Sequence, residues 1–386
     1  MSKILILTDI GFSKRDYDRF GIEELKKNYE VKILDFTEIF FSNSFNKDEI
    51  DVHKVDNYYK VSNFQQSLEF IQSSNAKFVF DWTVSKQSYQ LREFLKDKKI
   101  QTIRYEGALM PDTKRTLYEF IHKLFFLIFK IKKLINKILL RFNNAIVFNK
   151  KVFSYDYVIV SGKQGLNTAY AKNAKKLIFG HSMNFEQYLQ DQGKENFIKK
   201  KNYSVFLDQY LPFHPGARQR AEQSMTTEKK YYPALNNFFS EFEKIHALKT
   251  IISAHPRSRY DLKPDLFYRR EVSKFQTLEL IKNSKVVIAH QSTAVSFAVL
   301  FKKPLIFLTT DEIHISFDDF RIDSLSRDLN STLVNIDHLN RYMSLLKSEK
   351  IFSVDNNKYD QFKDDYIKFP GSKNKSVWDI FISNLN

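Results

Sequence analysis

The chain has 386 residues, of which 43% are hydrophobic and 15% aromatic, enough for two α/β domains of ordinary size. It contains no cysteine, which excludes disulfides and thiolate metal sites and fits a reducing cytoplasm. The formal charge of +16 favours an anionic partner, either nucleic acid, an acidic lipid surface or a phosphorylated substrate.

In the amino-terminal half, predicted strands and helices alternate. Short apolar runs predict strands at residues 3–8, 31–36, 77–81 and 100–105, and helical spacing predicts helices at 16–29, 64–73 and 89–96. Residues 42–60 are polar, so we expect a surface connection there. The alternation predicts a doubly wound α/β domain over residues 1–175. The opening apolar run is too short for a signal peptide, and no run reaches the roughly 18 residues of a transmembrane helix.

Acidic residues follow two strands of this domain. Glu106 ends the strand before Gly107, and glycine allows the chain to turn sharply there. A carboxylate at that edge could act as a general base, or it could be a solvated turn residue. Asp9, directly after the first strand, is a weaker candidate for acceptor or cleft contacts.

A basic segment spans residues 120–151, FIHKLFFLIFKIKKLINKILLRFNNAIVFNKK, with eight Lys or Arg and no acid. Lys130, Lys133, Lys137 and Arg141 fall near one helical face, opposite a wide apolar arc. Such a basic amphipathic helix suits the surface of an anionic membrane. The alternative is a helix packed on the protein's own core with its lysines in solvent.

Further along the chain, other polar residues are weaker candidates for acceptor or cleft contacts. Lys163 follows a predicted strand in SGKQG, which lacks the spacing of a P-loop, and His181 follows the next strand. Asp208 and His214 lie on a proline-bounded loop that begins the second α/β set. Without a third ligand they are a weak metal site, so we expect no bound metal and assign them to positioning an acceptor or the loop itself.

The stretch from residue 251 to residue 310 predicts strand, helix, strand, helix and strand. Ligands bind at the carboxyl ends of strands in such sheets. The residues at these ends that we expect to bind a nucleotide or phosphate are His255, Pro256, Arg257, His290, Ser292 and Thr293. Ser292 and Thr293 stand where a helix should begin, and a helix start offers backbone N–H groups and a positive dipole to an anion. We assign residues 176–355 to a second Rossmann-like domain and 356–386 to helices that cross back onto the first.

This layout resembles GT-B glycosyltransferases, two doubly wound Rossmann-like domains facing a cleft. More narrowly, Glu106-Gly107, His255-Pro256 and Ser292-Thr293 resemble, in order, the motifs of bacterial sialyltransferases, polysialyltransferases and Kdo-transferases, which use CMP-activated sugars. In those families an acidic pair precedes the glycine, where this chain has Tyr105-Glu106. The segment FLDQYLPFHPG also resembles proteins of surface-polysaccharide biosynthesis.

The resemblance implies Glu106 as general base, His255 as the group that stabilises the departing CMP phosphate, and Ser292 and Thr293 as phosphate ligands, with Pro256 shaping the nucleotide pocket. The expected activity is metal-independent transfer of a Kdo- or sialic-acid-type sugar to a growing cell-surface glycan. The nucleotide-sugar is a co-substrate, with no further cofactor, and the acceptor is a glycan or a lipid-linked glycan.

We expect the enzyme to be cytoplasmic and peripheral on the inner face of the cytoplasmic membrane, held by the basic segment. One alternative keeps the fold but uses a nucleoside-diphosphate sugar or a CDP-polyol, and His214-Pro215 leaves this open. Another is a basic nucleic-acid-binding protein. No RRM, zinc or helix-turn-helix pattern supports that second reading, so we expect no nucleic-acid partner.

Overall fold

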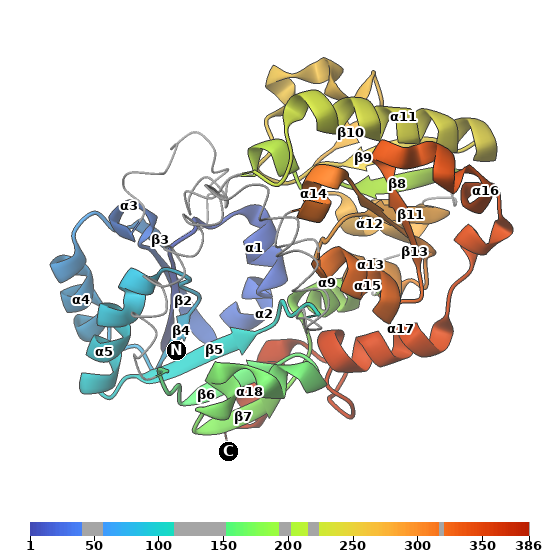
Figure 1. The fold of residues 1–386 in the computed structure, drawn as a ribbon. Helices are drawn as coiled ribbons and strands as arrows, with labels where there is room; N and C mark the ends of the chain where they lie inside the picture. The colour runs from blue at the N-terminus through green and yellow to red at the C-terminus, as the bar shows by residue number, and fades with distance from the viewer. Residues whose placement is uncertain (41–56, 112–151, 193–201, 215–223, 316–319, 386) are drawn as a thin grey trace.

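The computed structural model describes residues 1–40, 57–111, 152–192, 202–214, 224–315 and 320–385, and it contains two entirely parallel β-sheets (Figure 1). The first sheet has the strand order β3(Tyr58–Lys60), β2(Tyr29–Asp35), β1(Ser2–Thr8), β4(Phe78–Asp81), β5(Gln101–Glu106), β6(Tyr157–Val160) and β7(Lys176–Phe179). The second has the order β10(Val272–Ser273), β9(Lys249–Ser253), β8(Tyr203–Leu207), β11(Val286–Ala289), β12(Leu305–Thr309) and β13(Thr332–Asn335).

Both sheets are buried on their two faces, as parallel sheets require. In β1, Ile4 and Ile6 enter one apolar cluster, whereas Leu5 and Leu7 enter the cluster on the opposite face. This alternation follows from the two-residue period of a strand. All four residues of β11 and all five of β12 are buried, which explains why these strands are continuous apolar runs in the sequence.

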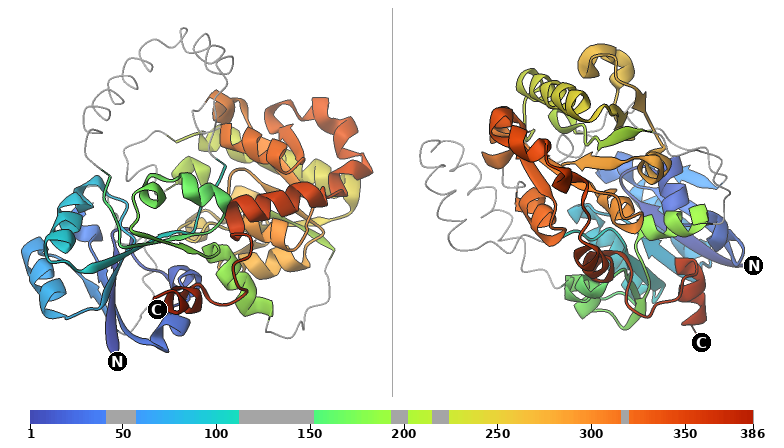
Figure 2. Two further views of the ribbon diagram at one scale, coloured as in Figure 1. Left: turned by 90° about the horizontal axis from the view of Figure 1, so that it is seen from below. Right: turned by 90° about the vertical axis from the view of Figure 1, so that its right-hand side faces the viewer.

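Helices cover the faces of each sheet (Figures 1 and 2). Those of the first half are α1(Lys14–Arg19), α2(Ile22–Lys26), α3(Thr37–Phe40), α4(Phe64–Ser73), α5(Tyr89–Asp97), α8(Ala169–Lys172) and α9(Met183–Gln192). Those of the second half are α11(Glu228–His246), α12(Thr277–Asn283), α13(Val295–Leu300), α14(Asp311–Ile315), α15(Phe320–Asp328), α16(Met343–Leu346), α17(Asn356–Phe362) and α18(Val377–Ser383).

The single helix predicted over residues 16–29 is wrong, because the structure has two short helices there. Gly21 separates α1 from α2 with φ of 59°, a left-handed conformation that favours glycine. The predicted surface connection over 42–60 is also wrong at its end, where β3 pairs with β2. Residues 41–56 lie outside the part of the chain that the structure describes.

The chain crosses back at its carboxyl end, as predicted. Trp378 and Phe381 of α18 are fully buried in the core of the first domain, where the Trp378 indole donates to the carbonyl of Phe20. Figure 2 shows α18 beside the first helices. In contrast, Tyr359 of α17 belongs to the core of the second domain, so the predicted crossing at residue 356 is too early.

The predicted domain boundary at residue 175 also needs correction. β7 begins at Lys176 and pairs with β6, so the first sheet extends beyond residue 175. The following helix, α9, contributes Met183 to the first core and Phe185 to the second. The connection between the domains therefore runs through α9. No described helix is long and apolar enough to cross a membrane.

Candidate functional site at the domain junction

The loops that follow the strands of the two sheets meet at the junction between the domains. Arg257, in the loop after β9, donates from Nη2 to the carbonyl oxygen of Ile10, after β1, at 3.0 Å. Asn184 of α9 donates to the carbonyl oxygen of Thr293, after β11, at 2.7 Å. Strand ends of both sheets thus contribute to one region, which we call the junction.

His255 lies at the junction with a defined tautomer. Its Nδ1 accepts a hydrogen bond from the backbone N–H of Arg257 at 3.2 Å, so the proton of the neutral ring is on Nε2. No hydrogen bond to Nε2 is seen from the residues that the structure describes. Burial lowers the pKa of His255 well below its ordinary value, and His214, Arg15 and Arg257 lower it further. At neutral pH the ring is therefore a neutral N–H donor, and a bound anion would favour its protonation.

Asp208, after β8, holds this loop in place. Its carboxylate accepts from the backbone N–H of His255 at 3.2 Å, from the backbone N–H of Tyr210 at 2.9 Å and from the Tyr260 hydroxyl at 2.9 Å. The side chain is buried, and burial raises its pKa to about 6. His214 contacts the same loop, with its ring centroid 5.3 Å from that of His255. Asp208 therefore positions the His255 backbone.

The other predicted nucleotide-binding residues of this domain have different surroundings. His290 is fully buried, with Nδ1 bonded to the Leu308 carbonyl at 2.6 Å and Nε2 to the Tyr231 hydroxyl at 2.8 Å. Both ring nitrogens thus have protein partners, which is the geometry of a core histidine. Ser292 is partly exposed, as are Pro256 and Thr293, and the Ser292 hydroxyl accepts from the N–H of Ala294 at 3.2 Å.

Two buried side-chain atoms in these loops lack hydrogen bonds within the described residues: Ser258 Oγ, in the loop after β9, and Gln291 Oε1, after β11. Buried polar atoms are nearly always hydrogen-bonded in folded proteins. Gln291 is also tied to the neighbouring strand end, because its N–H donates to Gln209 Oε1 at 2.9 Å. Two orphaned polar atoms in the loops after β9 and β11, the strands on either side of β8, are consistent with a ligand at this edge of the sheet.

In the first domain, Glu106 ends β5 and is oriented by Arg104. Glu106 Oε1 accepts from Arg104 Nε at 3.2 Å, and the two side chains are 13% and 12% exposed. The Arg104 guanidinium lies over the rings of Trp82 and Tyr170, with centroid distances of 5.5 and 5.0 Å. Glu106 Oε2 has no hydrogen bond from the described part of the chain. A carboxylate with one oxygen fixed and one open can accept a proton from a bound hydroxyl.

Asp9 is fully buried and joins two loops of the first domain. It accepts from the backbone N–H groups of Val84 at 3.0 Å and Ser85 at 2.7 Å. Burial raises its pKa to about 6, although these hydrogen bonds oppose the rise. Asp9 therefore fixes the loop after β4 at the carboxyl edge of the first sheet.

Lys163 and His181 lie under the crossing carboxyl-terminal segment. Lys163 forms an ion pair with Asp364 at 3.5 Å, and its side chain is 53% exposed. His181 is fully buried with Nε2 2.8 Å from the Lys375 carbonyl oxygen. Both residues thus contact the segment between α17 and α18.

Arg15 and Arg19 of α1 are residues that sequence reasoning missed. Arg19 is 8% exposed, and its buried Nε has no hydrogen-bond partner among the described residues. Burial lowers its pKa to about 9, and the nearby Arg15 lowers it further. The pKa of Arg15 is also lowered by burial, with a contribution from Arg257 across the junction. The signal available in the sequence was the spacing of one helical turn, which places both on one face.

Two predictions are not tested by the geometry of the site: membrane binding by the basic segment and the absence of a bound metal. Lys130, Lys133, Lys137 and Arg141 lie outside the described residues. Among the residues that are described, no three His, Cys, Asp or Glu side chains are grouped as metal ligands.

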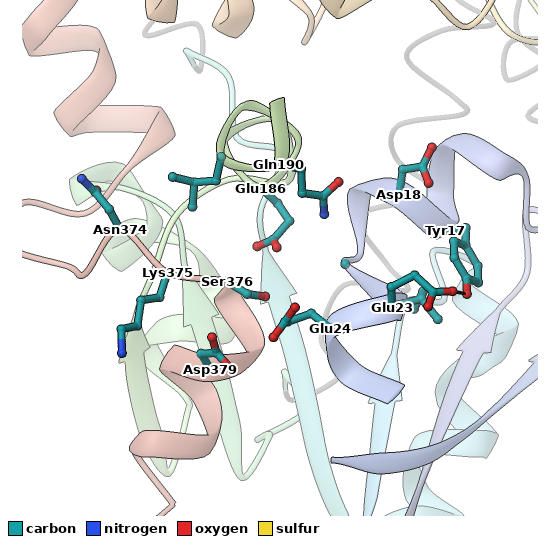
Figure 3. Close-up of a pocket in the computed structure, with 13 residues that line it drawn as sticks. Tyr17, Asp18, Glu23, Glu24, Glu186, Gln190, Asn374, Lys375, Ser376 and Asp379 are labelled. Atoms are coloured by element: carbon teal, nitrogen blue, oxygen red, sulfur yellow. Dashed lines mark hydrogen bonds between the residues drawn. The ribbon is translucent and has the colours of Figure 1, made fainter. Parts of the chain in front are cut away.

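A cavity of about 400 Å³ opens elsewhere, between α1, α2, α9 and the start of α18 (Figure 3). Its wall is acidic, with Asp18, Glu23, Glu24, Glu186 and Asp379 among its residues. None of the predicted site residues that the structure describes lines it. Its negative wall suits neither a phosphate nor a sugar carboxylate, so we do not assign it to the predicted site.

The two parallel sheets, the junction between their loops and the crossing of α18 define an α/β two-domain fold of the GT-B type. No family model matches the sequence, and no curated protein matches it. Solved structures do match over nearly the whole chain. The UDP-GlcNAc 2-epimerase of Methanocaldococcus jannaschii, in complex with UDP-GlcNAc and UDP, has a TM-score of 0.52 and 13% identity, with 100% of both chains covered.

Two further structures have the same architecture. A putative UDP-N-acetylglucosamine 2-epimerase from Listeria monocytogenes has a TM-score of 0.56 and 10% identity, covering 100% of this chain and 97% of that one. The wall teichoic acid polymerase TagF, soaked with CDPG, has a TM-score of 0.52 and 14% identity, covering 99% and 87%. At these identities the likeness concerns the fold.

Proposed function

We propose that this protein is a glycosyltransferase-type enzyme that binds its nucleotide-sugar donor at the carboxyl edge of the second sheet. The observation that carries the proposal is the His255–Arg257 loop, which presents a neutral N–H donor and a guanidinium at the junction. Solved neighbours that bind UDP-GlcNAc, UDP or CDP-glycerol support a nucleotide-linked substrate.

In the proposed reaction, an acceptor hydroxyl oxygen attacks the anomeric carbon while the bond from that carbon to the phosphate oxygen breaks. Glu106 takes the hydroxyl proton through its open oxygen. His255 Nε2–H and Arg257 stabilise the negative charge that develops on the phosphate. Arginine binds phosphate through parallel N–H bonds, so these groups can hold the leaving group without a metal.

We further propose a CMP-activated donor of the Kdo or sialic-acid type and a growing lipopolysaccharide, capsule or O-antigen chain as acceptor. The support is the order of the Glu106-Gly107, His255-Pro256 and Ser292-Thr293 motifs along the chain. Two of the similar structures contain UDP-GlcNAc with UDP, or were soaked with CDPG, so a nucleoside-diphosphate sugar or CDP-polyol is the second candidate donor.

A thermal-shift series with CMP, CDP, UMP, UDP, GDP and ADP tests the proposal. A ligand that binds only the folded state stabilises it by about 2.7 kcal/mol at a concentration 100 times its Kd. Arg257→Gln should remove at least half of that stabilisation, which is a tenfold weaker Kd. Arg259→Gln is the matched control, because Arg259 pairs with Asp261 two residues away at 3.1 Å and is 39% exposed.

The response to the nucleotides separates the candidates. Stabilisation by CMP alone supports the CMP-sugar donor, and stabilisation by a diphosphate favours the second candidate. If no nucleotide stabilises the protein, or if both arginine variants respond like the wild type, the proposed site is wrong. Retention of RNA that survives competition by lipid would instead favour the nucleic-acid-binding alternative.

For localisation, we propose peripheral attachment to the inner face of the cytoplasmic membrane through the basic segment. The support is its sequence pattern, a cationic face opposite an apolar arc. Neutralising Lys130, Lys133, Lys137 and Arg141 together should release the protein from liposomes that contain acidic lipid, because each basic residue contributes about 1 kcal/mol near such a surface. Unchanged pelleting would assign the segment to packing on the protein.

A further inference from the structure

The two arginines of α1 are cations without counter-ions in the described structure. Arg15 and Arg19 lie one helical turn apart, hence on the same side of the helix. Neither forms a hydrogen bond or an ion pair with any residue that the structure describes. Arg19 is only 8% exposed, and its Nε is among the few buried side-chain atoms that lack a hydrogen-bond partner in the described ranges of the chain.

Carboxylates near these arginines are already engaged. Asp16 Oδ2 accepts from the N–H of Ser13 at 3.0 Å and from its hydroxyl at 2.7 Å, closing the capping box that starts α1. Asp18 pairs with Lys14 on the same helix. Asp16 is close enough to act on the pKa of both arginines, but it forms an ion pair with neither.

Within the part of the chain that the structure describes, the remaining charged or titratable groups that face the pair add no compensating charge. Arg15 faces Arg257 of the second domain, and Arg19 faces Arg15 and Tyr105. Tyr105 is neutral, because burial raises the pKa of its hydroxyl well above the ordinary value, and that hydroxyl donates to the His181 carbonyl at 2.6 Å. Buried charges are ordinarily paired, since removal from water strongly disfavours an isolated ion.

We propose that Arg15 and Arg19 bind an oxyanion, a carboxylate or phosphate group carried by the substrate outside its nucleotide. Two guanidinium forks on one helix face match the paired oxygens of such a group. The pair lies in the first domain beside Tyr105, which directly precedes Glu106 in β5, so the bound anion sits near the carboxyl end of that strand.

Assignment of this anion to the sugar or the acceptor rests on the proposed function. The site itself can be tested without any activity. The test compares wild type, Arg19→Met and Arg15→Met with Lys14→Met, an exposed residue of the same helix, as control. The probes are glycerol 3-phosphate and N-acetylneuraminate, with chloride salt at matched ionic strength as the reference.

Two results are expected. Without probe, Arg19→Met should raise the Tm by roughly 2 °C or more, because methionine removes a buried charge and keeps much of the apolar volume. With probe, the wild type and Lys14→Met should be stabilised, whereas Arg19→Met and Arg15→Met should lose most of that stabilisation. If Arg19 only stabilised the fold, Arg19→Met without probe would have a lower Tm than the wild type, not a higher one.

The probe that acts identifies the source of the anion. Stabilisation by N-acetylneuraminate indicates an acidic sugar, and stabilisation by glycerol 3-phosphate indicates a phosphorylated acceptor or polyol. The proposal is overturned if neither probe stabilises the wild type at about 50 mM, a concentration that would fill a site with a Kd in the millimolar range. It is also overturned if Arg19→Met responds to the probes like the wild type.

The outcome is separable from the fate of the nucleotide site. If nucleotides fail to stabilise the protein but a probe acts through Arg19, the anion site stands and the proposed function falls. If nucleotide stabilisation depends on Arg257 and persists in Arg19→Met while the probe effect is lost, the protein has two distinct anion sites. Rescue of part of the probe effect by Arg19→Lys would show that charge, and not only the fork, contributes.

Discussion

Asp208→Asn should change the stability of this protein by an amount that depends on pH. Burial raises the pKa of Asp208 from 3.8 to about 6, so the folded protein binds its proton more tightly than the unfolded chain does. The stability that this proton provides is complete below pH 3.8 and is lost as the pH rises through about 6. At full ionisation the loss amounts to about 3 kcal/mol.

Asparagine does not titrate, so this loss is absent from the variant. Linkage between the two pKa values gives a wild-type loss of about 1.4 kcal/mol between pH 5 and pH 7.5 from this residue alone. The variant is also destabilised by an amount that does not depend on pH, because its amide N–H₂ replaces one carboxylate oxygen and cannot accept a hydrogen bond. Either the N–H of Tyr210, or the N–H of His255 and the hydroxyl of Tyr260, then lacks an acceptor.

Urea unfolding of both proteins at pH 5 and pH 7.5 measures the effect, since every other group titrates in both and cancels in the difference. The destabilisation caused by Asp208→Asn should be smaller at pH 7.5 than at pH 5 by about 1.4 kcal/mol. Tyr260→Phe provides the opposite control, because its hydroxyl stabilises the carboxylate and its removal should make the pH dependence steeper. If Asp208→Asn destabilised the protein equally at pH 5 and pH 7.5, the buried-carboxylate argument would be refuted.

The remaining predictions concern catalysis and the crossing helix. Glu106→Gln should lower turnover by about 10²- to 10⁴-fold with little change in nucleotide affinity, and the opposite pattern would make it a binding residue. His255→Ala should lower turnover by about 10²-fold or more while far-UV circular dichroism stays unchanged, and wild-type turnover would remove it from the mechanism. Phe381→Ala should lower the free energy of unfolding by about 3–5 kcal/mol, because the Phe381 ring packs edge-on against those of Phe78 and Tyr157, with centroid distances of 5.3 and 5.4 Å. Urea titration checks the last value, and a change below about 1 kcal/mol would place α18 outside the cooperative core.

The strands that the sequence predicts well are those buried on both faces. The unbroken apolar run at residues 286–289 predicts a strand, and the structure has β11 with the same bounds, because this strand is buried on both faces. The strands that were missed are short, and β3 and β10 are edge strands with half-exposed or exposed residues. At a sheet edge the burial that creates the apolar pattern is incomplete, so the local signal is weak.

For the site, the sequence locates strand ends but not what surrounds them. The position of His255 at the exit of a strand follows from the run before it, and the structure places it there. His290 occupies the same kind of position after β11, yet its partners come from Leu308 and Tyr231, one on a later strand and one on an earlier helix. Spacing along the chain carries no information about those contacts, so two similar histidines acquire different surroundings.

The arginines of α1 illustrate the same limit for charge. The segment SKRDYDRF alternates bases with acids, a pattern typical of a solvated helix whose charges compensate one another. In the fold, Ser13 and Lys14 engage the two aspartates, and the helix then turns Arg19 inward. Local charge balance therefore hides a buried imbalance, which arises only when capping and tertiary packing assign the carboxylates elsewhere. A cation left over in this way, next to the end of a strand that also carries Glu106, is a stronger indication of an anionic substrate than the net charge of +16, most of which can be solvated.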